Sequence, residues 1–304
     1  SPIVKRIAKK KAMISYNPKD WITFIFRFHR SDTVRRLFPL IVLISVYSAG
    51  IAYLELEVWQ LSAQSYVRNI SVMHTLLGFV ISFLLVFRTN TAYERWWEGR
   101  RLWGTLVNTS RNLAMKLAAL LHAEADERDF FRAMIPAYAA ALQRHLRSEE
   151  TRIELFDKLP AAVQQKMDLE KHIPNQIAAL LYSRVLFLAE QGKLSGEHLL
   201  FLNPELQSFT DVCGACERIK NTPIPYSYSV FIKKFIFFYI MTLPFGYVFS
   251  LGYYVIPIVA FIFYVLASLE IIAEEIEEPF GADENDLPLG MISRNIQMHI
   301  GELI

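Results

Sequence analysis

The sequence predicts an all-α membrane protein with four transmembrane helices per subunit and a helical cytoplasmic region. Hydrophobic residues make up 53% of the 304-residue chain, more than an ordinary soluble domain contains. Three long stretches, at residues 37–54, 70–87 and 235–269, contain no charged side chain. Alternation of polar and apolar residues with period two is almost absent, so we expect no strands.

The first two membrane helices are expected at residues 37–54 and 70–87. Pro39 falls in the first turn of the first helix, where proline is tolerated. Each stretch is long enough to cross a hydrocarbon core of roughly 30 Å. Between them we expect a short, slightly acidic loop that contains Glu55 and Glu57.

The last charge-free stretch is too long for a single membrane helix. As one helix, residues 235–269 would extend for about 52 Å at 1.5 Å per residue. We therefore expect a hairpin of two spans, at about residues 235–250 and 253–270, with its turn near Gly252.

The region between the spans, about residues 88–226, is expected to be helical and cytoplasmic. Apolar residues such as Leu106, Leu113 and Leu117 recur at helical spacing, and the second membrane helix should run on into this region. The N-terminal segment is strongly basic, and the region between the spans is also rich in arginine and lysine. The excess of positive charge on the cytoplasmic side of membrane proteins then places both termini in the cytoplasm. An acidic C-terminal segment is expected at residues 270–304.

Three phenylalanines, at positions 79, 83 and 87, repeat every four residues within the second span. This spacing places Phe79, Phe83 and Phe87 on one face of a helix. One interpretation is contact with lipid or a neighbouring helix. The other is a hydrophobic constriction in an ion pathway.

Signals of enzymatic chemistry are missing. The sequence contains no glycine-rich phosphate loop, no zinc-protease motif and no nucleophile elbow, so we predict neither enzymatic activity nor a required cofactor. No nucleic-acid partner is expected. Cys213 and Cys216 have the spacing of a redox or half-zinc motif but no second ligand pair, which favours two buried thiols. His74, inside the second span, is expected to make a helix contact.

Several motifs, taken together, resemble the bestrophin family, and its prokaryotic members most closely. They are the run AYERWWEGRRLWG at 92–104, the Ile-Pro pair at 224–225, EEIEEPFG at 274–281 and NDLP at 285–288. The resemblance covers nearly the whole chain. It implies a single channel unit over residues 1–304 that assembles as a homopentamer around one central pore, as a multi-pass protein in the lipid of the bacterial inner membrane.

The resemblance also implies two constrictions. The family's narrow neck matches Phe79, Phe83 and Phe87, and its cytoplasmic aperture matches Glu197, or His198 if the register slips by one residue. A ring of Glu197 carboxylates would attract cations. The alternative is that Ser195-Gly-Glu-His merely starts a helix, where the helix dipole favours an acidic residue.

A calcium site is the third implication of the resemblance. In calcium-activated animal bestrophins the acidic stretch after Pro-Phe-Gly binds calcium. Asp283 and Asp286 match its acidic positions, while Glu275 and Glu278 stand where amide ligands are expected. The alternative is a solvated acidic segment, or a partner for the basic N-terminus.

The expected function is a pentameric channel that conducts small monovalent ions and favours cations. The first alternative is a chloride or anion channel, as in animal bestrophins. The second is a membrane scaffold that conducts nothing.

Overall fold

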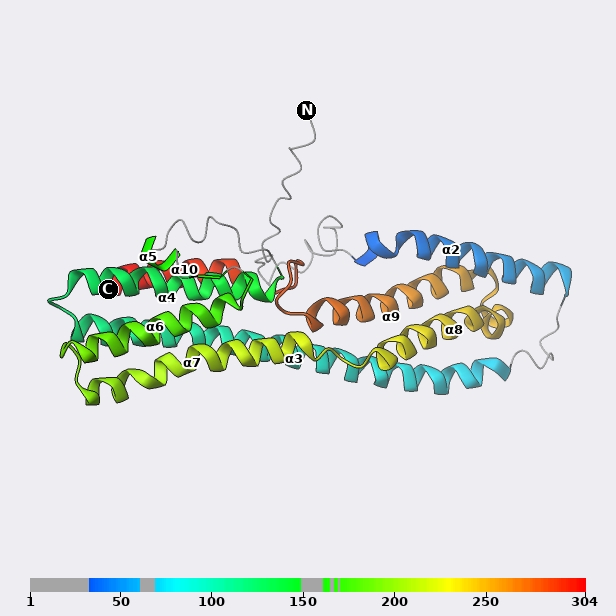
Figure 1. Ribbon diagram of the computed structural model, residues 1–304. Coiled ribbons are helices and arrows are strands. Elements are labelled where there is room, and N and C mark those ends of the chain that lie inside the picture. Colours follow the sequence, from blue (N-terminus) through cyan, green and yellow to red (C-terminus); the bar gives the residue numbers. More distant parts are fainter. Residues whose placement is uncertain (1–32, 61–68, 149–160, 165–166, 169) are drawn as a thin grey trace, which may run out of the picture. The chain divides into compact units, whose positions relative to one another are not determined.

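The computed structural model describes residues 33–60, 69–148, 161–164, 167–168 and 170–304, and most of the basic N-terminal segment lies outside these ranges (Figure 1). Regular structure in the described residues is entirely helical, which confirms the all-α prediction. The chain divides into two compact units. We call residues 33–95 with 223–277 the span unit, and residues 96–222 with 278–304 the bundle unit.

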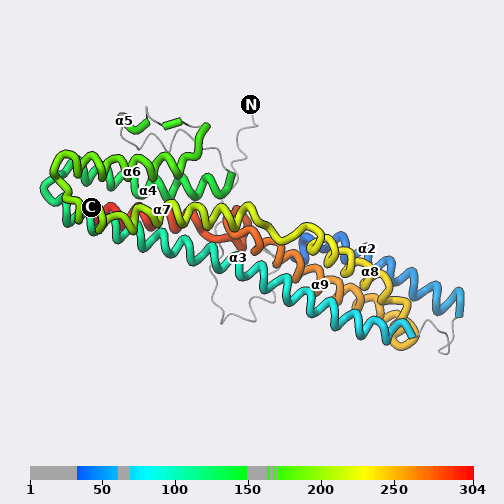
Figure 2. The backbone as a smooth tube through the Cα atoms, turned by 60° about the horizontal axis from the view of Figure 1, so that its bottom comes forward, coloured from blue at the N-terminus to red at the C-terminus, as the bar shows by residue number. Residues whose placement is uncertain are grey.

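The span unit is built from apolar helices. Helix α2 (Thr33–Tyr53) continues as a π-helical turn, η1 (Leu54–Val58), and is followed by the first half of α3 (Ile70–Leu120). Helix α8 (Tyr226–Leu251), the short 3₁₀ turn η4 (Gly252–Tyr254) and α9 (Val255–Glu277) complete the unit. Helix α9 packs against both α2 and α8 (Figures 1 and 2).

Three helical stretches in the described residues are long and apolar enough to cross a membrane: Thr33–Val58, Ile70–Leu120 and Tyr226–Glu277. The last of these is the predicted hairpin. Its chain reverses at Gly252, whose φ of 55° lies in the left-handed region that glycine adopts without strain. The predicted turn is confirmed.

The helix ends differ from the predicted span boundaries. Helix α8 begins at Tyr226, directly after Pro225, rather than near residue 235, and α9 continues to Glu277 rather than 270. Charge-free sequence marks the apolar part of a helix, whereas the helix itself continues through paired charges and is bounded by prolines, Pro225 before α8 and Pro279 after α9. Lys233 of α8 and Glu274 of α9 lie within these extensions and pair with each other at 3.0 Å.

Glu55 was expected in a loop, and this expectation was wrong. No proline or glycine follows α2 at once, so the helix continues as η1 and carries Glu55 into a fully buried position. The chain leaves helical structure only at Trp59 and Gln60.

The bundle unit packs the rest of α3 with α4 (Ala125–Leu146), α6 (Ile173–Glu190), α7 (Gly196–Asn221) and α10 (Leu289–Leu303); a short α5 (Ala161–Gln164) precedes α6. Helix α4 contacts α6, α7 and α10, and α6 contacts α7. The predicted leucine face of α3 is confirmed, because Leu106, Leu113 and Leu117 are fully buried in the core. The C-terminal segment, residues 270–304, is acidic only in its first part, because it ends in α10, a helix with an apolar face.

Candidate functional site

The phenylalanine stripe, Phe79, Phe83 and Phe87, lies on one exposed face of α3. The ring centroids of Phe79 and Phe83 are 6.3 Å apart, and those of Phe83 and Phe87 are 4.7 Å apart. The three residues are 73%, 55% and 51% exposed in the single chain. A continuous row of large apolar rings is thus available to lipid or to another copy of the chain.

The opposite face of α3 holds the helix against the span unit. Ile81, Leu85, Arg88 and Ala92 are all buried. At 100° per residue these side chains centre about 170° from the phenylalanine stripe. Packing on one side therefore fixes the rotation of α3 so that the stripe points away from its own unit.

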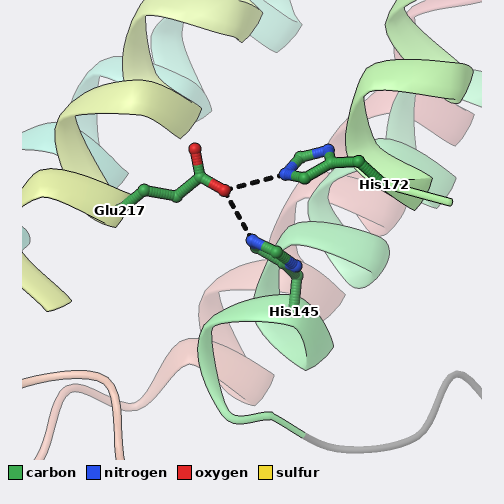
Figure 3. A group of neighbouring side chains, drawn as sticks. All are labelled: His145, His172 and Glu217. Carbon is green, nitrogen blue, oxygen red and sulfur yellow. Dashed lines mark hydrogen bonds and ion pairs between the residues drawn. The ribbon is translucent and has the colours of Figure 1, made fainter. Parts of the chain in front are cut away.

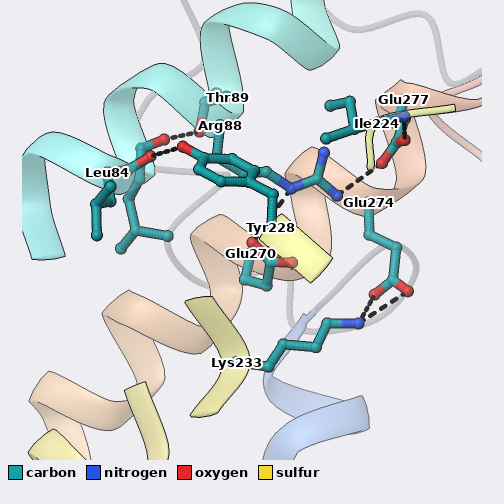
Figure 4. Close-up of polar contacts among 10 residues, drawn as sticks. Leu84, Arg88, Thr89, Ile224, Tyr228, Lys233, Glu270, Glu274 and Glu277 are labelled. Carbon is teal, nitrogen blue, oxygen red and sulfur yellow. Dashed lines mark hydrogen bonds and ion pairs between the residues drawn. The ribbon is translucent and has the colours of Figure 1, made fainter. Parts of the chain in front are cut away.

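Arg88, the residue after the stripe, is the centre of a buried ion-pair cluster with Glu270 and Glu277 of α9 (Figure 4). Its guanidinium Nη2 lies 2.7 Å from the Glu277 carboxylate, and its Nε lies 3.5 Å from that of Glu270. Arg88 and Glu270 are almost completely buried. A buried charge is tolerated only when it is paired, so these contacts constrain how α3 meets α9.

Glu277 also organises the chain around this cluster. Its Oε1 accepts a hydrogen bond of 2.7 Å from the backbone N–H of Ile224, and its backbone carbonyl accepts one of 3.0 Å from Arg95 Nε. Tyr228 at the start of α8 donates to the Leu84 carbonyl at 3.3 Å (Figure 4). Glu277 and Tyr228 thus connect α3, α9 and the start of α8 next to the phenylalanine stripe.

Residues of three sequence motifs meet within the bundle unit. Trp96 Nε1 donates a hydrogen bond of 3.0 Å to the Asn285 carbonyl. A Cβ on Gly99 would lie 3.0 Å from a ring carbon of Phe280, so a larger residue here would require this buried ring to shift. The tryptophan-rich motif therefore contacts both the Pro-Phe-Gly motif and the Asn-Asp-Leu-Pro motif.

Glu197 and His198, the candidate aperture residues, lie in the first turn of α7. Ser195 caps this helix: its hydroxyl accepts from the His198 N–H, and the His198 imidazole accepts from the Ser195 N–H. The helix-start interpretation is confirmed for this segment, with His198 closing the capping box. Glu197 is exposed in the single chain, and its place in an aperture stays a prediction.

The candidate calcium residues are divided between the two units. Glu275, in the span unit, pairs with Arg36, which agrees with the alternative of a partner for basic N-terminal residues. Glu278, Asp283 and Asp286 belong to the bundle unit. Among the described residues, Glu278, Asp283 and Asp286 do not bring three ligand atoms close enough together to share one ion. Calcium binding by them stays a prediction.

Asp286 has a clear role within its loop. Its Oδ2 accepts a hydrogen bond of 2.6 Å from the Asp283 N–H, and the side chain is buried. Burial raises the pKa of Asp286 to about 6, and the neighbouring Asp283 and Glu278 carboxylates add to the shift. The carboxyl group is thus positioned to hold the turn between α9 and α10.

The cysteines and His74 behave as predicted. Cys213 and Cys216 are free, buried thiols on α7, and burial raises the pKa of Cys213 to about 12. Such thiols are poor nucleophiles and poor metal ligands. His74 is buried and lies 2.9 Å from the Thr242 hydroxyl of α8, with Tyr239 and Tyr247 at its ring edges. It makes the expected helix contact.

Sequence reasoning missed two clusters: Arg88 with its glutamates, and a group formed by His145, His172 and Glu217 (Figure 3). An arginine at the end of one apolar stretch and glutamates at the end of another were a usable signal for the first. The second joins residues far apart in sequence and carries no local motif.

Comparison with known proteins decides the family. A family model described as a bacterial/fungal bestrophin protein matches residues 13–302. The chain belongs to the bestrophin family. The resemblance seen in the motifs is thereby confirmed over nearly the whole chain, and the chain is a membrane protein of this ion-channel family.

Related bestrophin sequences carry channel names. A voltage-dependent anion channel-forming protein of Synechocystis is 31% identical over 296 residues, which cover 95% of this chain and 94% of the relative. One from Ralstonia nicotianae is 35% identical over 76% of each chain. One from Escherichia coli K12 is 30% identical over 95% of this chain and 93% of the relative.

Solved structures agree with the assignment. A mutant of a bacterial bestrophin homologue from Klebsiella pneumoniae is 28% identical and superposes with a TM-score of 0.81, covering 88% of this chain and 99% of that one. A second structure from the same organism gives a TM-score of 0.79 at 30% identity, covering 86% and 96%. The fold of the described chain is the bestrophin fold.

Proposed function

We propose that this bestrophin forms a homopentameric channel that conducts small monovalent ions through a neck lined by Phe79, Phe83 and Phe87. The observation that carries the proposal is the phenylalanine stripe, because it is exposed on the face of α3 opposite the buried one. A membrane helix that turns a row of aromatic rings away from its own subunit needs something to cover them. In a channel family, the copies around a pore axis can do so.

The assembly follows from the size of the span unit. Its few helices pack around their own apolar core and cannot also enclose a pore, so a pore requires a ring of subunits. We propose four membrane helices per subunit, with α8 and α9 as separate spans. The middle region, which is rich in arginine and lysine, and both termini then face the cytoplasm of a bacterial inner membrane.

Selectivity is proposed to be set outside the neck. Phenylalanine rings carry no net charge, so a hydrophobic neck can control the passage of water and ions by dewetting without fixing the sign of the ion. A ring of exposed Glu197 carboxylates at the cytoplasmic aperture would favour cations. The bestrophin relatives named as anion channel-forming proteins support the alternative, anion selectivity.

Reversal potentials measured in a planar bilayer separate these alternatives. Under a gradient of NaCl, we expect the purified channel to reverse near the sodium equilibrium potential. Glu197→Gln should shift the reversal toward zero, while Glu302→Gln, an exposed acid on α10, should leave it unchanged. Reversal near the chloride equilibrium potential, unaffected by Glu197→Gln, would contradict cation selectivity and favour the anion channel. A protein that is folded but silent would instead favour the scaffold.

A further inference from the structure

Three side chains of the bundle unit converge at the ends of three helices. His145 lies in the last turn of α4, His172 directly precedes α6, and Glu217 lies near the end of α7 (Figure 3). Glu217 Oε1 is 2.6 Å from His145 Nε2 and 2.8 Å from His172 Nε2. The two imidazole centroids are 4.4 Å apart. One carboxylate oxygen thus bridges two histidines.

The chemistry of this group matches a known class of metal site. Two imidazoles and one glutamate, with a fourth position open, are the ligands of several catalytic zinc sites. Their ligand atoms all lie within 4.8 Å of one another, close enough to bind one ion. Each side chain is roughly one-third exposed, so an ion can reach the group from solvent.

The nearby positive charge of Lys220 does not occupy the Glu217 carboxylate, which stays available to bind a metal ion. Lys220, one turn after Glu217, points its Nζ to the His145 carbonyl at 3.1 Å and to the Ser148 hydroxyl at 2.7 Å. Burial alone would raise the pKa of Glu217, but the hydrogen bonds from His172 and His145 outweigh it and lower the pKa. The Glu217 carboxylate therefore contacts the two imidazoles, while Lys220 bonds to His145 and Ser148 instead.

We propose that His145, His172 and Glu217 form a binding site for a divalent transition-metal ion of the Zn²⁺ class, with solvent at the fourth position. The ion would take the place of the protons that the imidazoles now share with Glu217. The ligand atoms must separate to about 3.3 Å for tetrahedral bonds of about 2.0–2.1 Å. Small side-chain rotations supply a movement of this size.

Metal binding has one local cost. The His172 Nδ1 accepts a hydrogen bond of 3.2 Å from the backbone N–H of Asn175, so Nε2 carries the proton in the neutral ring. When Nε2 binds a metal, a neutral ring carries its proton on Nδ1, and this cap of α6 is lost. Metal binding therefore removes a weak cap of α6 and links α4, α6 and α7 through the ion.

Metal titration of the full-length protein in detergent tests the site. His172→Asn removes the imidazole and keeps a residue that caps helices well. Glu217→Gln keeps the shape of the side chain and removes its charge. His122→Asn is the matched control, since His122 is exposed just after α3. Circular dichroism and size-exclusion elution confirm that each variant is folded.

We expect wild type and the control to retain one Zn²⁺ per chain after equilibrium dialysis at micromolar free Zn²⁺. Both should also show the visible absorption bands of tetrahedral Co²⁺. Each ligand variant should bind at least about tenfold more weakly and lose those bands. Wild type that retains no metal, or ligand variants that bind as well as wild type, would overturn the site. Because the readout is bound metal rather than current, the result is independent of channel function.

Discussion

At the scale of single residues, buried charge is the property that sets this chain apart from a simple apolar bundle. Arg88 and Glu270 are buried beside the phenylalanine stripe, and Asp286 is buried in the loop that joins α9 to α10. Their types were visible in the sequence, but their burial was not, because it depends on which distant segments pack around them. The glutamates of α9 were read as part of an acidic segment, whereas Glu277 hydrogen-bonds Ile224 and pairs with Arg88.

Asp286 should make the stability of the bundle unit depend on pH. Because burial raises its pKa to about 6 from an ordinary value near 4, the native state holds this proton more tightly than the unfolded state does. Its favourable contribution is complete below about pH 4 and is lost as the pH rises through about 6. Asp286→Asn, which keeps an oxygen to accept from Asp283, should therefore stabilise the protein at pH 7 by about 1–3 kcal/mol.

Thermal unfolding of wild type and Asp286→Asn, measured between pH 4 and pH 7.5, checks this prediction. The difference in unfolding temperature should be largest at pH 7.5 and shrink toward pH 4. Glu302→Gln, which changes an exposed acid on α10, serves as the control. A difference that stays constant with pH would show that Asp286 does not titrate as expected.

At the scale of elements, the sequence predicts which segments are helices better than where they end. Charge-free stretches located the apolar helices, and Gly252 located the hairpin turn, because both depend on local chemistry. The ends of α8 and α9 lay beyond the charge-free stretch, since Lys233 and Glu274 pair across the hairpin and remain inside helices. Glu55 was misplaced for the same reason: a charge does not by itself end a helix.

The ion-pair cluster between α3 and α9 should show strong energetic coupling. Arg88→Met leaves the Glu270 carboxylate buried without its partner, which typically costs about 3–5 kcal/mol. Adding Glu270→Gln removes that charge, so the double variant should be more stable than Arg88→Met alone. A double-mutant cycle of unfolding free energies measures the coupling. Strictly additive effects of the two changes would contradict a direct interaction.

At the scale of the whole molecule, the family could be predicted from the sequence, because its motifs are local and specific. Their contact could not be predicted: Trp96 with Asn285 and Gly99 with Phe280 become neighbours only in the folded bundle unit. The His145–His172–Glu217 group was invisible for the same reason. The phenylalanine stripe could be predicted in part. Its spacing was evident in the sequence, but the direction in which it points became clear only from the buried face of α3.

The proposed channel requires that the phenylalanine stripe line the ion pathway. Ion flux into liposomes that contain the purified protein tests it most directly, by comparing wild type with the triple variant Phe79→Ala, Phe83→Ala and Phe87→Ala. The matched control changes three exposed phenylalanines of α8 to alanine, Phe231, Phe237 and Phe238. Removing a hydrophobic constriction should raise flux several-fold, roughly as dewetting is relieved, while the control keeps the wild-type rate. Flux that is unchanged in the stripe variant, or raised equally in the control, would contradict the claim.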